Sequence, residues 1–430
     1  MISLKDYVEK HFHSFKTQSS VLNVGHYNIN SLRDIYIFAN YNPSSIKYTT
    51  KQNINSVEFI LEESRLRPSI KNIDLVGFPI NAEIIAIKCT QFGEIYYFSV
   101  IFSKEDEESF FQVYITRDID SIGEIYFEKK LNILPIVIQN TFFFPCETNP
   151  DIMKPAFLVT GQNLASDMNE EDDDEDCSFK RIKLFVPDEN GLCELNDNEI
   201  KQYFPEFMLC SSIGLILSFN SLINAEKMVR TSAFGTVEGT FIVAQVDLKS
   251  SNVRKFKYSH NSIIVDLKLI QSPINDQINL CVLNSVEPCV IYLNVSNAMF
   301  DNDENKMRAN HPKQLTLRES DQYDCVTSMT FCDIDYDGED EILIGTFSAN
   351  LLCYKLQSNK TYKLIDKRKV HGPIHKIVCL YLFNDGTKSL VVMTNRGLHI
   401  FQLNITTLFK IMNVQLDEMI QLPEKNPILT

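Results

Sequence analysis

Two similar segments near the C-terminus constrain the fold more than any other feature of this chain. The segment Tyr323–Leu356 reads YDCVTSMTFCDIDYDGEDEILIGTFSANLLCYKL, in which apolar, β-branched runs alternate with short polar breaks. A second copy opens 48 residues further along at Asp385–Gly386, and its Ser389–Leu403 repeats the pattern of Glu341–Leu356. Four-stranded units that recur every 40 to 50 residues or so are typical of β-propeller blades.

The chain length then predicts the number of blades. The chain has 430 residues, and at about 45 residues per blade this gives about seven blades. We therefore expect an all-β fold, a single seven-bladed β-propeller over residues 17–404. A short N-terminal extension (1–16) precedes it, and a C-terminal tail (405–430) follows. Residues 413–422 fit a short helix and a frayed end equally well. The ring-closing strand comes from residues 1–16 or from the stretch after Gln402.

Individual blades are predicted from runs of strand-forming residues. The first predicted blade has four strands: Val21–Gly25, Asp34–Asn40, Ser45–Thr50 and Asn55–Glu63. The third blade is interrupted by an acidic loop (166–177) that contains the seven successive carboxylates of Glu170–Asp176. Seven adjacent like charges repel one another and cannot pack, so we expect this stretch to be a solvated loop.

Composition excludes several classes of function. The net charge of −15 argues against nonspecific nucleic-acid binding, which needs Lys and Arg to displace counterions, and against electrostatic docking on anionic lipid. No secretory signal is visible, and no apolar run approaches the roughly 18 residues of a membrane span. The eleven cysteines are odd in number and include no CxxC pair. We therefore expect a cytoplasmic protein that uses cysteine as a small apolar residue and does not insert into membranes.

A turn rich in carboxylates is the candidate metal site. Asp333, Asp335, Asp337 and Glu341 form the pattern DxDxDGxxE around Gly338. Alternating carboxylates in a tight turn can converge on one hard cation, and the spacing is similar to the calcium-type loop of FG-GAP propeller repeats. The same spacing also fits a turn in which Asp side chains cap backbone amides. Both interpretations stay open.

Two comparisons limit this candidate site. An EF-hand is excluded, because its twelfth position requires Glu and this chain has Ile344 there. In the alignment on Asp385–Gly386, Tyr381 and Phe383 stand where the sixth blade has Asp333 and Asp335. The sequence therefore predicts at most a single calcium ion.

No motif predicts an enzyme. The chain contains no GxSxG, no P-loop, no GxGxxG and no HExxH. We predict no catalytic residues and no cofactor-binding residues. A propeller enzyme remains an alternative, which would gather titratable side chains at one mouth of the central channel.

The longest characteristic segment resembles the kaptin family. Ser320–Lys355 (SDQYDCVTSMTFCDIDYDGEDEILIGTFSANLLCYK) is similar to the family's acidic-aromatic lead, DxDxDG turn and LLCYK strand. Four shorter segments agree in order: Phe15–Val21, Pro79–Ile87, Phe204–Glu206 (FPE) and Val392–Gln402. The resemblance covers about residues 12 to 403 and is weakest between 100 and 200. The chain departs from the family at the acidic run 170–176 and at Tyr381 and Phe383.

The resemblance implies a non-catalytic propeller in a multi-subunit assembly. Kaptins are subunits of KICSTOR, in which they pair with a second FG-GAP propeller subunit and a large scaffold subunit. KICSTOR holds the GATOR GTPase-activating complex at the lysosomal surface and restrains the target-of-rapamycin kinase when nutrients are scarce. The family is also associated with actin filaments. An actin binder usually presents a basic face, which in this acidic chain would lie near Lys227–Arg230 or Lys360–Lys369.

Overall fold

The computed structural model describes most of the chain, with gaps. The described residues are 3–14, 24–30, 33–40, 53–62, 65–79, 82–104, 108–118, 121–144, 153–163, 182–188, 191–212, 214–271, 277–298, 312–380, 387–404, 406, 407, 409, 410 and 413. The acidic run 170–176, the two residues Tyr381 and Phe383, and residues 414–430 lie outside this set.

The described strands form an all-β fold of seven four-stranded antiparallel sheets. The first four sheets in chain order are β2 (Val24–Asn30), β3 (Arg33–Asn40), β4 (Asn53–Glu62) and β5 (Arg65–Asn72); β6 (Glu83–Phe92), β7 (Ile95–Ser103), β8 (Ser109–Thr116) and β9 (Tyr126–Leu131); β10 (Ile133–Phe143), β11 (Lys154–Asn163), β12 (Ile182–Asp188) and β13 (Gly191–Glu194); and β14 (Ile216–Asn224), β15 (Val229–Thr236), β16 (Thr240–Asp247) and β17 (Val253–Ser259).

The other sheets continue this order. They are β18 (Ile264–Gln271), β19 (Ile278–Asn284), β20 (Val290–Leu293) and β21 (Lys313–Thr316); β22 (Val326–Cys332), β23 (Glu341–Thr346), β24 (Asn350–Leu356) and β25 (Tyr362–Lys369); and β26 (Ile374–Leu380), β27 (Ser389–Thr394) and β28 (Gly397–Leu403) with β1 (Tyr7–Ser14). The helical segments are α1 (Asp197–Tyr203) and the 3-10 turns η1 (Leu4–Asp6), η5 (Pro205–Ser212), η6 (Val295–Ala298) and η8 (Ser320–Tyr323).

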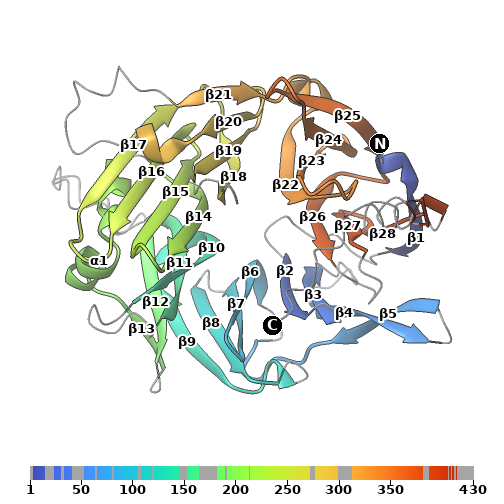
Figure 1. Ribbon diagram of the computed structural model, residues 1–430. Helices are drawn as coiled ribbons and strands as arrows, with labels where there is room; N and C mark the ends of the chain where they lie inside the picture. Colours follow the sequence, from blue (N-terminus) through green and yellow to red (C-terminus); the bar gives the residue numbers. More distant parts are fainter. Residues whose placement is uncertain are drawn as a thin grey trace, which may run out of the picture.

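The sheets are arranged like the blades of a propeller. Figure 1 shows them around a common centre, with β2, β6, β10, β14, β18, β22 and β26 innermost and β5, β9, β13, β17, β21 and β25 at the rim. Apolar side chains fill the layers between neighbouring sheets. One such layer joins the fifth and sixth sheets through Leu283, Ile291, Val326 and Ile342, all at most 3% exposed. Neighbouring sheets cover both faces of each sheet, and for this reason the inner strands read as nearly continuous apolar runs.

The N-terminus supplies the outermost strand of the last sheet. β1 pairs antiparallel with β28, from Tyr7 opposite Leu403 to Ser14 opposite Gly397. The interpretation of residues 1–16 as an extension outside the propeller is therefore wrong for residues 7–14. Of the two candidates for the closing strand, the N-terminal segment is the one the structure shows. The strand was hard to recognise because only Tyr7 of YVEKHFHS is buried, and the exposed positions of this outer strand mix polar and apolar side chains.

The first sheet differs from its predicted strands in one respect. The predicted strand Asn55–Glu63 is β4, the third strand of the sheet, and the fourth is β5 (Arg65–Asn72). β5 contains Pro68, and a proline argues against a strand except at a sheet edge. β5 is an outer strand, where that exception applies. The predicted strand Ser45–Thr50 lies outside the described residues.

A repeated glycine lets neighbouring sheets approach closely. Gly235 of β15 and Gly345 of β23 occupy equivalent second strands, and a Cβ at either would lie 2.5 Å from Cγ2 of an isoleucine in the next sheet, Ile264 or Ile374. The threonine that follows each glycine caps the next turn through its hydroxyl. The segments GTVEGT (235–240) and GTFSAN (345–350) are thus one repeated motif.

Candidate functional site

The carboxylate turn joins β22 to β23, and Asp333 organises its backbone. The two carboxylate oxygens of Asp333 accept hydrogen bonds from the amides of Asp337 (3.1 Å) and Gly338 (3.0 Å). Asp337 accepts from the amide of Glu339 in the same way (3.0 Å). Tyr336 and Gly338 have left-handed φ angles of 61° and 89°, which allow the sharp reversal. The interpretation in which Asp side chains cap backbone amides is therefore confirmed for Asp333 and Asp337.

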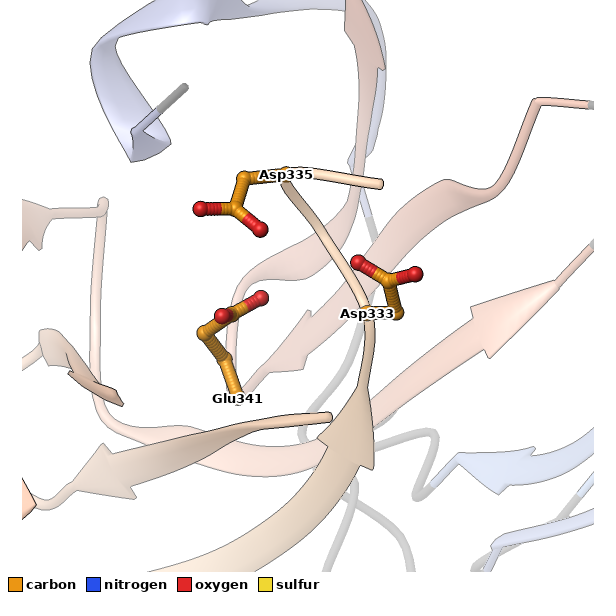
Figure 2. A group of neighbouring side chains, drawn as sticks. All are labelled: Asp333, Asp335 and Glu341. Carbon is orange, nitrogen blue, oxygen red and sulfur yellow. The ribbon is translucent and has the colours of Figure 1, made fainter. Parts of the chain in front are cut away.

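Lys355 of β24 brings a positive charge into the same turn. Its Nζ lies 2.6 Å from Asp335 Oδ2, 2.5 Å from Asp337 Oδ2 and 2.9 Å from Glu341 Oε1. Glu341 is fully buried, and its other oxygen accepts from the Ile334 amide (2.9 Å). Figure 2 shows the side chains of Asp333, Asp335 and Glu341 gathered at this turn. The spacing of the carboxylates did not point to Lys355, although this residue lies within the segment that resembles the kaptin family.

The electrostatics of the turn follow from burial and from these contacts. Burial works against the Lys355 ammonium, but its hydrogen bonds to Asp335, Asp337 and Glu341 outweigh that cost and raise its pKa. Burial raises the pKa of Glu341 above its ordinary value, and the Lys355 ammonium only partly offsets this. Burial also opposes ionisation of Asp337, but hydrogen bonds from Lys355 and the Glu339 amide prevail and lower its pKa. The Lys355 ammonium therefore favours the ionised form of Asp337, whereas burial disfavours ionisation of Glu341.

The donor set can be tested against a calcium ion. Ligand oxygens of Asp333, Asp335 and Glu341 lie within 4.8 Å of one another, and carboxylates are the ligands that calcium prefers. Asp335 Oδ1 is buried without a hydrogen-bond partner among the described residues. However, both oxygens of Asp333 already bind backbone amides, and the Lys355 ammonium occupies the space among the other carboxylates. A calcium ion would have to displace this ammonium, so calcium at this turn stays a prediction.

The FPE tripeptide supplies a second buried charge cluster. Glu206 of η5 and Arg230 of β15 are both fully buried, with contacts of 2.6 Å from Nε to Oε1 and 2.8 Å from Nη2 to Oε2. Arg230 also donates to the Tyr203 carbonyl (2.6 Å) and lies over the ring of Phe204. This fork holds the α1–η5 segment against the fourth sheet. It is a structural role, since neither charge reaches solvent.

The structure distinguishes between the two segments that were candidates for a basic face. Arg230 is buried in the fork just described, so the segment Lys227–Arg230 does not form a basic face. In the segment Lys360–Lys369, the side chains of Lys363, Lys367 and Lys369 are exposed along the outer strand β25. A local basic stripe therefore exists at the rim of the sixth sheet. Within the described residues, no helix is long and apolar enough to cross a membrane.

The fold defines a propeller-like all-β protein. Its four-stranded sheets surround a common centre, and a lysine of the same sheet closes its carboxylate turn. The chain belongs to the kaptin family: the family described as "KICSTOR complex protein kaptin" matches residues 8–413. The mouse protein named "KICSTOR complex protein kaptin" is 26% identical over 372 residues, which cover 79% of this chain and 77% of the mouse protein.

One solved structure has a distant likeness to this chain. Raptor of Chaetomium thermophilum aligns with a TM-score of 0.47 and 11% sequence identity. The alignment covers 92% of this chain and 29% of the Raptor chain. We draw no conclusion on function from this likeness.

Proposed function

We propose that this chain is a non-catalytic scaffold subunit of a KICSTOR-like complex. The observation that supports it most is the match of residues 8–413 to a family whose description names that complex. In this proposal the chain forms a complete seven-bladed ring. The complex tethers the GATOR complex to lysosomes and negatively regulates target-of-rapamycin signalling in response to nutrients. The partners are a second FG-GAP propeller subunit and a large scaffold subunit.

Exposed apolar side chains on neighbouring sheets support a protein partner. Val286 lies in the turn between β19 and β20 and is 70% exposed, and Phe347 lies in the equivalent turn between β23 and β24 and is 57% exposed. Ile263, 40% exposed, adjoins the first turn, because its carbonyl accepts from the Ser285 amide. Apolar side chains clustered on a surface are typical of protein contacts. We expect this edge of the fifth and sixth sheets to contact a subunit.

The test is co-purification at endogenous expression level. The tagged chain is purified from its own cells, and its partners are quantified by mass spectrometry. We expect a second propeller subunit and a large scaffold subunit in stoichiometric amounts. Val286→Asp with Phe347→Asp should reduce their recovery about tenfold or more, which corresponds to about 1.4 kcal/mol of binding free energy. Ile125→Asp is the matched control, since Ile125 is 63% exposed in another loop. Recovery of neither subunit with the unaltered chain would overturn the proposal.

The rim lysines support a second candidate, an actin-filament-associated protein. Lys363, Lys367 and Lys369 present three positive charges from one outer strand, and actin filaments are acidic. Sedimentation with filaments across a salt series tests this function. We expect the pelleted fraction to fall with salt and to be lost when the three lysines are replaced by Glu. A pelleted fraction that is insensitive both to salt and to this substitution would remove the candidate.

A further inference from the structure

The inner strands share a β-bulge near their start, which places the residues after the bulge at equivalent positions in neighbouring sheets. In all six inner strands from β6 to β26, the pairing register with the second strand shifts within the first three pairs. The residues that follow the shift are Ala86, Val137, Ser218, Asp266, Ser328 and Lys376, and those two positions further on are Lys88, Gln139, Asn220, Lys268, Thr330 and Val378. Because alternate residues of a strand share a face, these positions form two tiers.

A small cavity lies among these tiers at the centre of the ring. Its volume is about 110 Å³, and all six of these inner strands contribute to its lining. The lining includes Lys88, Gln139, Asp266 and Lys376 together with two serines. Figure 1 shows the inner strands converging on this central region. The cavity has room for several water molecules but is well below the roughly 300 Å³ of pockets for drug-sized ligands.

The cavity is positively charged in a protein with a net charge of −15. Lys88 and Lys376 contribute two ammonium groups to its lining, and Asp266 contributes one carboxylate. No carboxylate of the described residues forms a salt bridge with Lys88 or Lys376, and Lys88 donates only to Gln139 Oε1 (3.1 Å). Burial and the nearby Lys376 charge lower the pKa of Lys88 to about 8. Two neighbouring ammonium groups repel each other unless an anion joins them.

One uncharged donor lines the same space. Gln139 uses its carbonyl oxygen to accept from Lys88, which leaves its amide N–H groups to donate. Ser218 and Ser328 also line the cavity, but their hydroxyl oxygens are buried against Gly235 and Gly345 of the second strands and are not donors to this space. Asp266 Oδ1 accepts from the Leu267 amide (2.9 Å), which draws one of its oxygens to the backbone.

We propose that this cavity binds a small oxyanion of the phosphate class. A tetrahedral oxyanion matches the size of the cavity, its excess positive charge and the N–H donors of Lys88, Lys376 and Gln139. The ligand is inorganic phosphate or the phosphoryl group of a phosphomonoester. Such an anion links several sheets at the axis, so its binding stabilises the ring. The proposal does not depend on membership of a complex.

The experiment measures phosphate binding to the purified full chain. Thermal unfolding and titration calorimetry are run with sodium phosphate, with phenyl phosphate and with sodium chloride at matched ionic strength. We expect phosphate to raise Tm by about 2–4 °C at ten to a hundred times its Kd, and chloride to have no effect. A response to phenyl phosphate alone identifies a phosphoryl group presented by a larger molecule. A response to neither compound overturns the proposal.

Variants separate the cavity from the surface. The double variant Lys88→Met, Lys376→Met should lose the phosphate response, and without phosphate its Tm should equal or exceed that of the unaltered chain, because two repelling charges are gone. Lys363→Met with Lys369→Met removes the same charge from the rim and should keep the full response. Gln139→Leu leaves every charge in place and should weaken binding about tenfold. If the cavity variants respond to phosphate as the unaltered chain does, the proposal is wrong.

Discussion

Replacing Lys355 by Met tests the idea that the carboxylate turn contains its own cation. The substitution keeps most of the volume of the side chain but removes the ammonium from three carboxylates. Glu341 is fully buried and the Asp335 side chain is 6% exposed, whereas that of Asp337 is 45% exposed. Breaking a buried ion pair by removing one partner costs about 3–5 kcal/mol. The exposed Asp337 contact adds at most about 1 kcal/mol.

The assay is urea-induced unfolding of Lys355→Met at several pH values. Without the ammonium, burial holds the folded-state pKa of Glu341 above its unfolded value. Protonation then favours the folded state, so the variant regains stability as the pH falls from 7 through that raised pKa toward about 4. We expect a loss of about 3–5 kcal/mol at pH 7 that shrinks at lower pH. Lys363→Met, an exposed lysine on β25, should change stability by less than about 0.5 kcal/mol.

Calcium provides the sharpest version of this test. In Lys355→Met the carboxylates are free to bind a divalent cation, so millimolar calcium should restore stability and a chelator should reverse the effect. In the unaltered chain, the ammonium excludes the ion and calcium should have little effect. A loss below about 1 kcal/mol that does not depend on pH would refute our reasoning on the buried pair. Equal stabilisation of both proteins by calcium would show that a metal binds beside Lys355.

Three further predictions concern the scaffold. Arg230→Met leaves the buried Glu206 carboxylate unpaired and should lower the free energy of unfolding in urea by about 3–5 kcal/mol. The double variant Glu206→Leu, Arg230→Met should recover part of this loss. No recovery would contradict the pairing. Deletion of residues 1–14 removes the buried Leu4 and Tyr7 and leaves β28 unpaired, so the protein should lose about 3–6 kcal/mol of stability. Limited proteolysis should then cut within β28. An uncut, equally stable protein would argue against ring closure by β1. Gly345→Val would place a side chain against Ile374 and should lower stability by about 1–3 kcal/mol, as calorimetry can measure.

The sequence alone determined the repeating architecture, because the pattern is local. Strand-forming runs with polar breaks, as in Tyr323–Leu356, fix where strands begin and end through residue preferences and turn chemistry. The buried cysteines Cys332 and Cys353 of that segment were predictable for the same reason, since their neighbours are apolar. The role of Asp333 as a cap of backbone amides also depends only on residues a few positions away.

Features that depend on pairing between distant segments could not be predicted from local sequence. β1 became the outer strand of the last sheet because β28 offers it an unpaired edge, and nothing within Tyr7–Ser14 reveals that partner. Lys355 reaches the carboxylate turn because β24 pairs with β23, which sets its ammonium among oxygens that the sequence spacing had made candidates for a metal site. Lys88 and Lys376, 288 positions apart in the chain, share one cavity because the ring brings its first strands together. Charges act through space rather than along the chain, so the positions of these ammonium groups could be known only once the sheets were assembled.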